Sequence, residues 1–198
     1  MAITELACLR FTNNLSLTDP ANAALNDKLR RGIQAQAEYT NAKASILSGI
    51  NEPSYIFIIG SWASVEQHME EWIPSATNQE IMGSLDGLEL VWILHFDFDQ
   101  STAQGDGIPY RAEDVEIARY FVSKADKEGF EETFNKYKSE RGQTAYGWRL
   151  DGEAKPGAEF EFIVLAGNQI KNDLPRMKEL EKFITDSDIQ HAKWEFHA

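Results

Sequence analysis

Hydrophobic and polar residues follow two different periods along this chain, and residues 55–72 show both of them. Residues 55–59, YIFII, are a run of aromatic and β-branched side chains, which is typical of a strand, and the strand is expected to end at Trp62. Ser64 and Gln67 follow with the spacing of a capping box. This spacing predicts a helix that begins directly after Ser64.

One face of that helix is apolar. Val65, His68, Met69 and Trp72 recur three and four positions apart, so their side chains lie on one stripe of the helix surface. We expect this stripe to pack against the sheet that contains the preceding strand.

The first half of the chain has the element order β-α-β-β-α-β, which is that of a ferredoxin-like unit. The expected strands are 3–12, 44–50, 55–62 and 88–97, and the expected helices are 21–42, 64–72 and a short one at 77–85. Residues 100–114 are polar and rich in glycine, as in a linker.

The second half repeats this order. Strands are expected at 115–123, 144–151, 160–166 and 190–196, and helices at 126–141 and 174–184. The predicted organisation is therefore a first repeat at 1–99, a linker at 100–114 and a second, diverged repeat at 115–198.

The predicted fold class is α+β, with two ferredoxin-like repeats in one chain. The face of each four-stranded sheet that no helix covers would be a large exposed apolar patch, which a soluble monomer rarely tolerates. We therefore expect the two antiparallel sheets to pack face to face as an α+β barrel. This arrangement is an intramolecular pseudo-dimer, and it leaves a homodimer open.

The strand, the Trp-x-Ser turn and the amphipathic helix resemble the antibiotic-biosynthesis monooxygenase family, a branch of the dimeric α+β barrel proteins. The residues that carry the resemblance are Trp62, Ser64, Glu66, His68 and Trp72. It implies a substrate pocket between helices and sheet, and cofactor-independent oxidation of an aromatic or polyketide-type molecule in secondary metabolism. A cyclase or isomerase on the same fold, and a non-catalytic binding or stabilising protein, are the alternatives.

The expected pocket lining follows from alternation along the strands. In the fourth strand, the face with Leu88, Leu90, Trp92, Leu94 and Phe96 should meet the helices. In the third, Tyr55, Phe57 and Ile59 should do so, while Ile56, Ile58 and Trp62 face the barrel. The substrate-binding candidates are Tyr55, Phe57, Trp62, Trp72 and Trp92, and each of these aromatic side chains also fits an ordinary core.

Two histidines are the catalytic candidates. His68 lies on the apolar helix stripe, and histidine is the side chain best able to move a proton near neutral pH. His95 is the second candidate because Asp97, two residues on, could orient it. Both also fit a structural role, and Arg10 and Arg119 on the first strand of each half could bind a phenolate or be solvated.

Composition narrows the function classes. The 198 residues are 42% hydrophobic and 26% charged, with a formal net charge of −13, which disfavours nucleic acids and anionic membranes as partners. No apolar run approaches the length of a membrane span, and a cytoplasmic location is expected. The single cysteine, Cys8, reads as a small buried side chain, and no Cys/His cluster suggests zinc.

No metal, flavin or haem cofactor is expected. Haem-degrading members of the resembled family use a strand-one Asn, the Trp of the turn and a later His. Only Trp62 is matched here, since Cys8 and Leu9 stand near the Asn position and Met82 near the His position.

Overall fold

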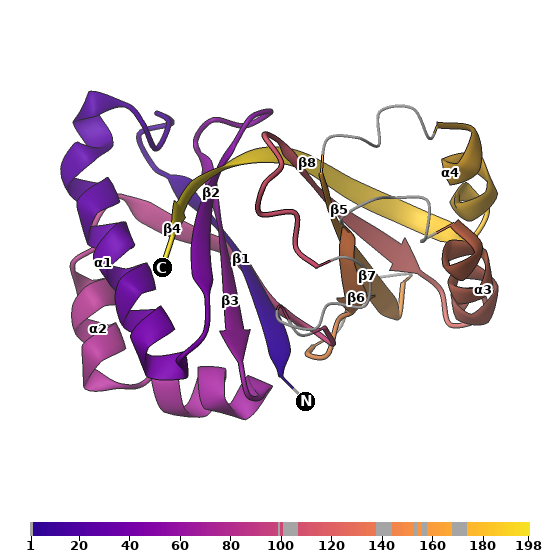
Figure 1. The fold of residues 1–198 in the computed structure, drawn as a ribbon, viewed down its shortest axis with the longest axis horizontal. Coiled ribbons are helices and arrows are strands. Elements are labelled where there is room, and N and C mark those ends of the chain that lie inside the picture. Colours follow the sequence, from indigo (N-terminus) through magenta and orange to yellow (C-terminus); the bar gives the residue numbers. More distant parts are fainter. Residues whose placement is uncertain are drawn as a thin grey trace. The chain divides into compact units, whose positions relative to one another are not determined.

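The computed structural model describes residues 2–98, 100, 107–137, 144–152, 154–155, 158–167 and 174–198. Its helices and strands fall into two compact units (Figure 1). The first comprises Met1–His95 with Ala192–Ala198, and the second comprises Phe96–His191.

In the first unit, hydrogen-bonded strands follow the order β4-β1-β3-β2, with the end of β8 beside β2. The elements are β1 (Ile3–Phe11), η1 (Pro20–Asn22), α1 (Ala23–Thr40), β2 (Ala44–Gly49), β3 (Tyr55–Trp62), η2 (Gln67–Trp72), α2 (Ala76–Gly83) and β4 (Leu88–Phe96). Strand β1 runs antiparallel to β3, and β3 antiparallel to β2. The predicted elements of this half are therefore present, with boundaries that shift by one to three residues.

In the second unit, the order is β8-β5-β7-β6. The elements are β5 (Val115–Val122), α3 (Lys127–Tyr137), β6 (Thr144–Trp148), β7 (Phe160–Gly167), α4 (Leu174–Glu181) and β8 (Ile184–His197), and the last of these continues into the first unit. Strand β7 is antiparallel to both β5 and β6. The α+β class with antiparallel strands is confirmed, whereas the two-repeat organisation and face-to-face packing stay predictions.

The largest difference from expectation lies between α4 and β8. Helix α4 ends at Glu181 and β8 already begins at Ile184, so the helix predicted to 184 and the strand predicted from 190 were wrong there. Ile184 and Thr185 are consecutive β-branched residues, which favour an extended backbone. The helix predicted at 126–141 has its expected end outside the described residues, and so does part of the predicted linker, residues 101–106.

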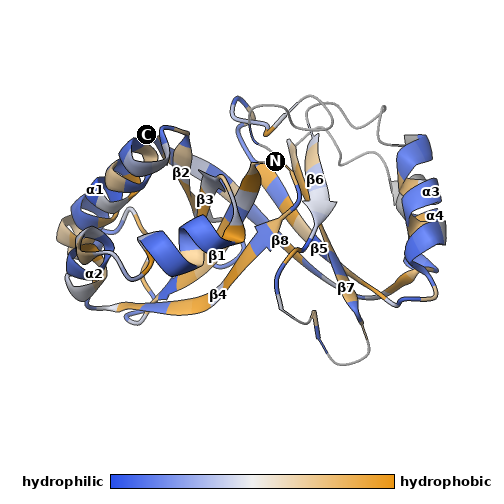
Figure 2. Cartoon of the chain, turned by 90° about the horizontal axis from the view of Figure 1, so that it is seen from below, coloured by the Kyte–Doolittle hydropathy of each residue, from blue (hydrophilic) through white to orange (hydrophobic). Residues whose placement is uncertain are grey.

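The core of the first unit lies between its sheet and α1. Its buried members come from four elements: Ala7, Leu9 and Phe11 of β1, Ala44 and Ile46 of β2, Ile56 of β3, and Leu29, Ile33 and Ala37 of α1, with Ile58 packed against them. Figure 1 shows α1 and α2 on the same side of these strands, and in Figure 2 strands β1 and β4 carry mostly hydrophobic colours.

This core corrects the predicted strand faces. Alternation correctly grouped Ile56 with Ile58, but that group faces α1 and not away from it. On the opposite face Phe57 packs against Trp92, with ring centroids 6.1 Å apart. In β4, Ile93 contacts the helix-side core, as does Leu88 at the start of the strand, while Leu90 is 56% exposed. Both faces of β3 are apolar, so alternation alone could not identify the face that the helices cover. In β4 the face with Ile93 and His95 meets the helices although it is the less apolar of the two.

The core of the second unit is dominated by aromatic rings. Phe130 and Phe134 of α3 pack on Tyr120 and Phe162 of the sheet, and Trp148 lies at the edge of this cluster. In Figure 2 the ribbons of α3 and α4 carry mostly hydrophilic colours.

Candidate functional site

A buried carboxylate lies at the centre of the candidate site. Glu5, in the middle of the apolar strand β1, has 4% of its surface exposed. Its Oε2 accepts a hydrogen bond of 2.7 Å from the Trp62 indole Nε1 and one of 2.9 Å from Gln36 Nε2. Strand pairing and α1 thus bring together three polar groups that are far apart in the sequence.

Gly60 makes room for this arrangement. It pairs with Glu5 across the β1–β3 ladder. A Cβ atom at position 60 would lie 2.0 Å from Gln36 Nε2 and 2.8 Å from Glu5 Oε2. Only a residue without a side chain allows the amide and the carboxylate to meet above this strand.

A turn of π-helix carries His68 into the site. The Ser64 hydroxyl accepts from the Gln67 backbone N–H at 3.2 Å, and the Gln67 side chain accepts from the Ala63 N–H, so the capping interaction closely follows the prediction. The segment from Gln67 to Trp72 then adopts the wider π form, with a 2.9 Å bond from the Ile73 N–H to the His68 carbonyl. Single π turns are rare and frequently occur at functional sites.

His68 connects the carboxylate to His95. Its Nε2 lies 3.8 Å from Glu5 Oε2, and its Nδ1 lies 2.7 Å from His95 Nε2. The indole of Trp62 stacks on the imidazole, with centroids 4.1 Å apart and 12° between the planes. Glu5, His68 and His95 thus lie in a line, with the two imidazoles at hydrogen-bond distance and the carboxylate 3.8 Å from His68.

The electrostatics of Glu5 suit proton exchange. Burial raises the pKa of Glu5 to about 7, and the bonds from Trp62 and Gln36 and the charge of His95 oppose this rise. An ordinary glutamic acid would be fully ionised at neutral pH. Here both protonation states are populated near pH 7, which is the range where an acid–base group is most effective.

An aromatic cover shields the site. His68 is 2% exposed, and Trp72 is buried beside it. Tyr39 of α1 packs on Trp72 with centroids 5.0 Å apart, and its hydroxyl donates to Glu71 of η2 at 3.1 Å. His68 is therefore shielded from solvent, and Tyr39 packs on its neighbours Trp62 and Trp72.

The structure brings together four of the seven predicted site residues. Those four are His68, His95, Trp62 and Trp72. The other three lie elsewhere, since Phe57 and Trp92 occupy the opposite face of the sheet and Tyr55 pairs with Arg10 at the far end of β3. The aromatic pocket expected from Tyr55, Phe57 and Trp92 around His68 is not formed, because the strand faces are inverted.

Asp97, which was expected to orient His95, is bound to the backbone of Trp148. Its carboxylate accepts the Trp148 backbone N–H at 2.5 Å. The imidazole of His95 instead meets His68 from the adjacent helix. Two residues along a strand share a face only while the strand stays regular, and β4 ends at Phe96 between them.

Sequence reasoning missed Glu5, Gln36 and Gly60. A signal existed for Glu5, which shares its strand face with Ala7, Leu9 and Phe11 and is therefore an acid at a core position. Such residues are almost never fully buried without a partner. Their partner could not be identified from the first strand alone.

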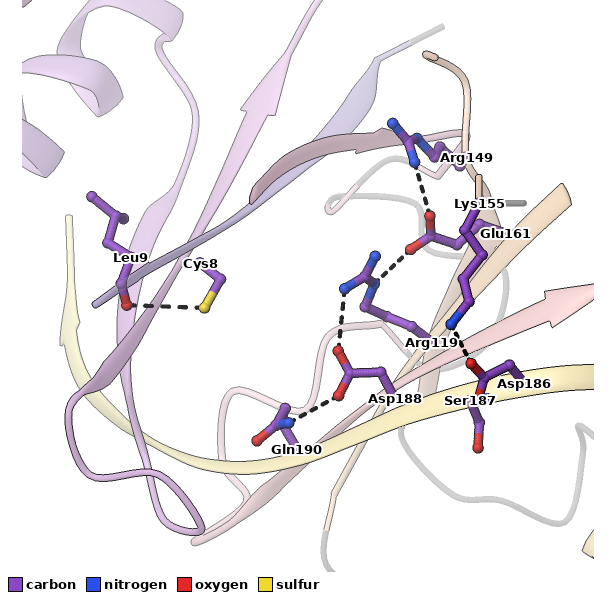
Figure 3. Close-up of polar contacts among 10 residues, drawn as sticks. All are labelled: Cys8, Leu9, Arg119, Arg149, Lys155, Glu161, Asp186, Ser187, Asp188 and Gln190. Atoms are coloured by element: carbon purple, nitrogen blue, oxygen red, sulfur yellow. Dashed lines mark hydrogen bonds and ion pairs between the residues drawn. The ribbon is translucent and has the colours of Figure 1, made fainter. Parts of the chain in front are cut away.

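The two strand arginines are bound to carboxylates. Arg10 pairs with Glu89. In the second unit, Arg119 Nε lies 2.5 Å from Glu161 Oε1, and Arg149 Nη1 reaches the other oxygen of Glu161 at 3.0 Å (Figure 3). Asp188 accepts from Arg119 and from Gln190. Arg149 also lies 3.5 Å from Asp151, so both arginines of this network are paired with carboxylates. Cys8 is buried, as expected.

Two cavities are lined by residues outside the Glu5–His68–His95 site. One, of about 390 Å³, lies between α1 and α2 and includes Lys28, Arg31 and Glu80. The other, of about 150 Å³, belongs to the second unit. Within the described ranges, no group of three or more His, Cys, Asp and Glu side chains has the arrangement of a metal site, and no helix is long and apolar enough to cross a membrane.

Comparisons with known proteins support the fold. The chain resembles the crystal structure of a putative monooxygenase from Lactobacillus acidophilus NCFM, with a TM-score of 0.62 and 9% identity over 100% of this chain and 95% of that chain. It resembles that of an anthrone oxidase-like protein with a TM-score of 0.63 and 10% identity over 100% of this chain and 92% of that chain. It also resembles a mutant chlorite dismutase from Candidatus Nitrospira defluvii, with a TM-score of 0.61 and 6% identity over 98% of this chain and 91% of that chain. No family model and no curated protein sequence matches the chain. At this level of identity the similarities show the fold alone, an α+β arrangement with antiparallel strands that extends over nearly the whole of each chain.

Proposed function

We propose that the first unit contains the reaction site of a cofactor-independent oxidase or monooxygenase that acts on a flat aromatic small molecule. The observation that carries the proposal is the buried Glu5–His68–His95 line, whose carboxyl has a pKa of about 7. The oxidative names of several proteins with the same fold support the reaction class.

In this reaction His68 accepts a proton from a phenol or an activated methylene of the substrate. The resulting carbanion has enough electron density to reduce molecular oxygen without help from a cofactor. For an anthrone, one atom of O₂ becomes the new carbonyl oxygen, and the other leaves as water with the two methylene hydrogens. The proton on His68 is shared with His95 at 2.7 Å and stabilised by the Glu5 carboxylate at 3.8 Å.

Trp62 has two roles in the proposal. Its indole N–H binds Glu5, and its ring stacks on His68, which fixes the orientation of the imidazole. The same proton removal would begin a cyclisation or isomerisation, so an enzyme of that class is the runner-up. Oxygen consumption distinguishes the two.

A non-catalytic binding or stabilising protein is the second candidate. The observation in its favour is the exposure of His68 and Trp62, which is only 2% and 1%. On this alternative the line of polar groups is a structural hydrogen-bond network, and η2 never moves to admit a ligand.

The finer context follows from the same resemblance. We place the substrate among polyketide-type aromatic compounds of secondary metabolism and the protein in the cytoplasm, without nucleic-acid or membrane partners. We also propose that the two units are copies of one ferredoxin-like repeat in a pseudo-dimer, with a homodimer as a further possibility. The matching strand orders β4-β1-β3-β2 and β8-β5-β7-β6 support this.

The experiment is an oxygen-uptake assay with an anthrone, a naphthol and a hydroquinone, each followed also by product absorbance. Enzyme-dependent O₂ consumption with product formation supports the oxidase. Product formation without O₂ consumption supports the isomerase class. Absence of turnover with all three, combined with saturable binding, favours the non-catalytic protein.

A further inference from the structure

The smaller cavity, in the second unit, has an unusual lining. Its volume is about 150 Å³, and its walls include Phe134, Tyr146, Trp148 and Phe162 together with the carboxylates of Asp97 and Glu131. A cavity of about this volume holds a molecule the size of benzene. The cavity lies between α3 and the sheet and shares no residue with the Glu5–His68–His95 line.

The aromatic rings form a connected wall. Phe134 lies 4.8 Å from Tyr146 and 4.9 Å from Phe162, and Trp148 lies 4.8 Å from Phe162, measured between ring centroids. These rings meet largely edge to face. The faces of such rings carry negative electrostatic potential, which attracts organic cations.

Two carboxylates add negative charge to the same cavity. Glu131 Oε1 accepts from the Trp148 indole Nε1 at 2.7 Å, and Asp97 Oδ1 accepts from the Trp148 backbone N–H. Each carboxylate has further lone pairs to offer, because an ionised carboxylate has about four acceptor positions. Gly147 permits this geometry, since a Cβ there would lie 2.5 Å from Asp97 Oδ1.

Burial raises the pKa of Asp97, and the neighbouring Glu131 acts in the same direction while Lys127 opposes it. Lys127 makes cation–π contacts beside this cavity, since its ammonium lies 4.7 Å from the Trp148 ring centroid and 4.2 Å from that of Phe160. Lys127 is outside the cavity lining. A cation inside the cavity would relieve the repulsion between the two carboxylates.

We propose that this cavity binds a small organic cation, an alkylammonium or arylalkylammonium ion whose apolar part is about the size of benzene. The rings stabilise its apolar body, and Asp97 and Glu131 receive its N–H groups. A hard metal ion is the wrong ligand for this lining, because aromatic carbon replaces the oxygen atoms that such ions require. An anion is disfavoured by both carboxylates.

The test uses benzylammonium as the probe and benzyl alcohol as its neutral isostere at pH 7.5. Binding is followed by calorimetry and by the NMR shift of the Trp148 indole N–H, with the Trp62 indole as an internal control. We expect benzylammonium to bind about tenfold more tightly than benzyl alcohol, to shift Trp148 but not Trp62, and to weaken at high salt. Equal affinity for the two probes, or no change at Trp148, overturns the proposal.

Two substitutions sharpen the test. Glu131→Gln retains an acceptor for the Trp148 indole but removes the charge, and it should weaken benzylammonium binding about fivefold or more while leaving benzyl alcohol unaffected. Glu132→Gln is the matched control, because Glu132 is the exposed neighbour on α3. Asp97→Asn keeps an acceptor for the Trp148 backbone and provides a second charge-removing variant. If Glu132→Gln reduces binding as much as the other two, the carboxylates of the cavity are not the recognition groups.

Discussion

His68 Nδ1 and His95 Nε2 lie 2.7 Å apart in a part of the protein where both side chains are almost completely buried. One of these nitrogen atoms must carry the shared proton and the other must accept it. The other nitrogen of His68 lies 3.8 Å from Glu5 Oε2. A proton gained at His68 therefore interacts with two neighbouring groups, His95 and Glu5. The following predictions depend on this contact.

Replacing His68 should lower the catalytic rate without changing the fold. A positioned proton-transfer group contributes about 10² to 10⁴ in rate, so His68→Ala should reduce kcat by that factor with any substrate that the oxygen-uptake assay identifies. Circular dichroism should show an intact fold. His191→Ala is the control histidine substitution, outside the site, and should retain full kcat. A loss of less than tenfold in His68→Ala would remove His68 from the mechanism, and His95→Ala would then be tested.

Replacing Glu5 should change how stability depends on pH. The pKa of Glu5 is about 7 in the folded protein against a model value of 4.5, so the folded state holds this proton more tightly than the unfolded state. Between these pH values the unfolded chain has already released the proton, and the free energy of unfolding falls as pH rises, by on the order of 3 kcal/mol by pH 8.

Glu5→Gln cannot ionise and keeps an acceptor for Trp62 and Gln36. We therefore expect this variant to match the wild type at pH 5 and to exceed its stability at pH 8, as measured by urea unfolding across that range. The same stability difference at both pH values would show that Glu5 does not titrate in this window.

Gly60→Ala should disrupt the site through a single methyl group. The new Cβ would overlap Gln36 Nε2 and press on Glu5 Oε2, so the amide must leave the buried carboxylate. Losing a hydrogen bond to a buried charged group costs about 1 to 3 kcal/mol, and thermal unfolding should report a loss of that size together with reduced turnover.

Gly83→Ala is the matched control, because no heavy atom lies within 4 Å of a Cβ built at position 83. Since it ends helix α2, alanine there should be neutral or slightly stabilising. If both glycine substitutions cost the same, the effect at position 60 reflects the backbone and not the site.

Ser64→Ala should weaken the start of the segment that carries His68. The Ser64 hydroxyl accepts from the Gln67 N–H at 3.2 Å, and removal of such a cap costs about 1 kcal/mol. Amide hydrogen exchange should show faster exchange confined to residues 65–73. Ser75→Ala removes the equivalent cap of α2, where Ser75 accepts from Asn78, and should loosen α2 without changing the exchange of residues 65–73.

Local sequence was sufficient for most of the elements. The YIFII run formed β3, and the Ser64–Gln67 spacing formed a cap at the expected place, because strand propensity and capping depend on residues close together in the chain. Of the predicted apolar stripe, His68 and Trp72 are buried, but Met69 is 40% exposed, so its predicted place against the sheet was wrong. The wider π turn was not foreseen, since an α-helix and a π turn have the same cap.

Tertiary structure decided the rest. Alternation showed that Ile56 and Ile58 share a face, but the side on which α1 packs depends on how the chain crosses over the sheet, and both faces were apolar. The partners of Glu5 come from positions 36 and 62, so its role existed only after β1 had paired with β3 and α1 had covered them. The sequence therefore determined most of the helices and strands and the burial of His68 and Trp72 on η2. Only the packing of α1 and η2 against β1, β3 and β4 could place a buried acid beside two histidines, because that contact depends on distances that no local pattern encodes.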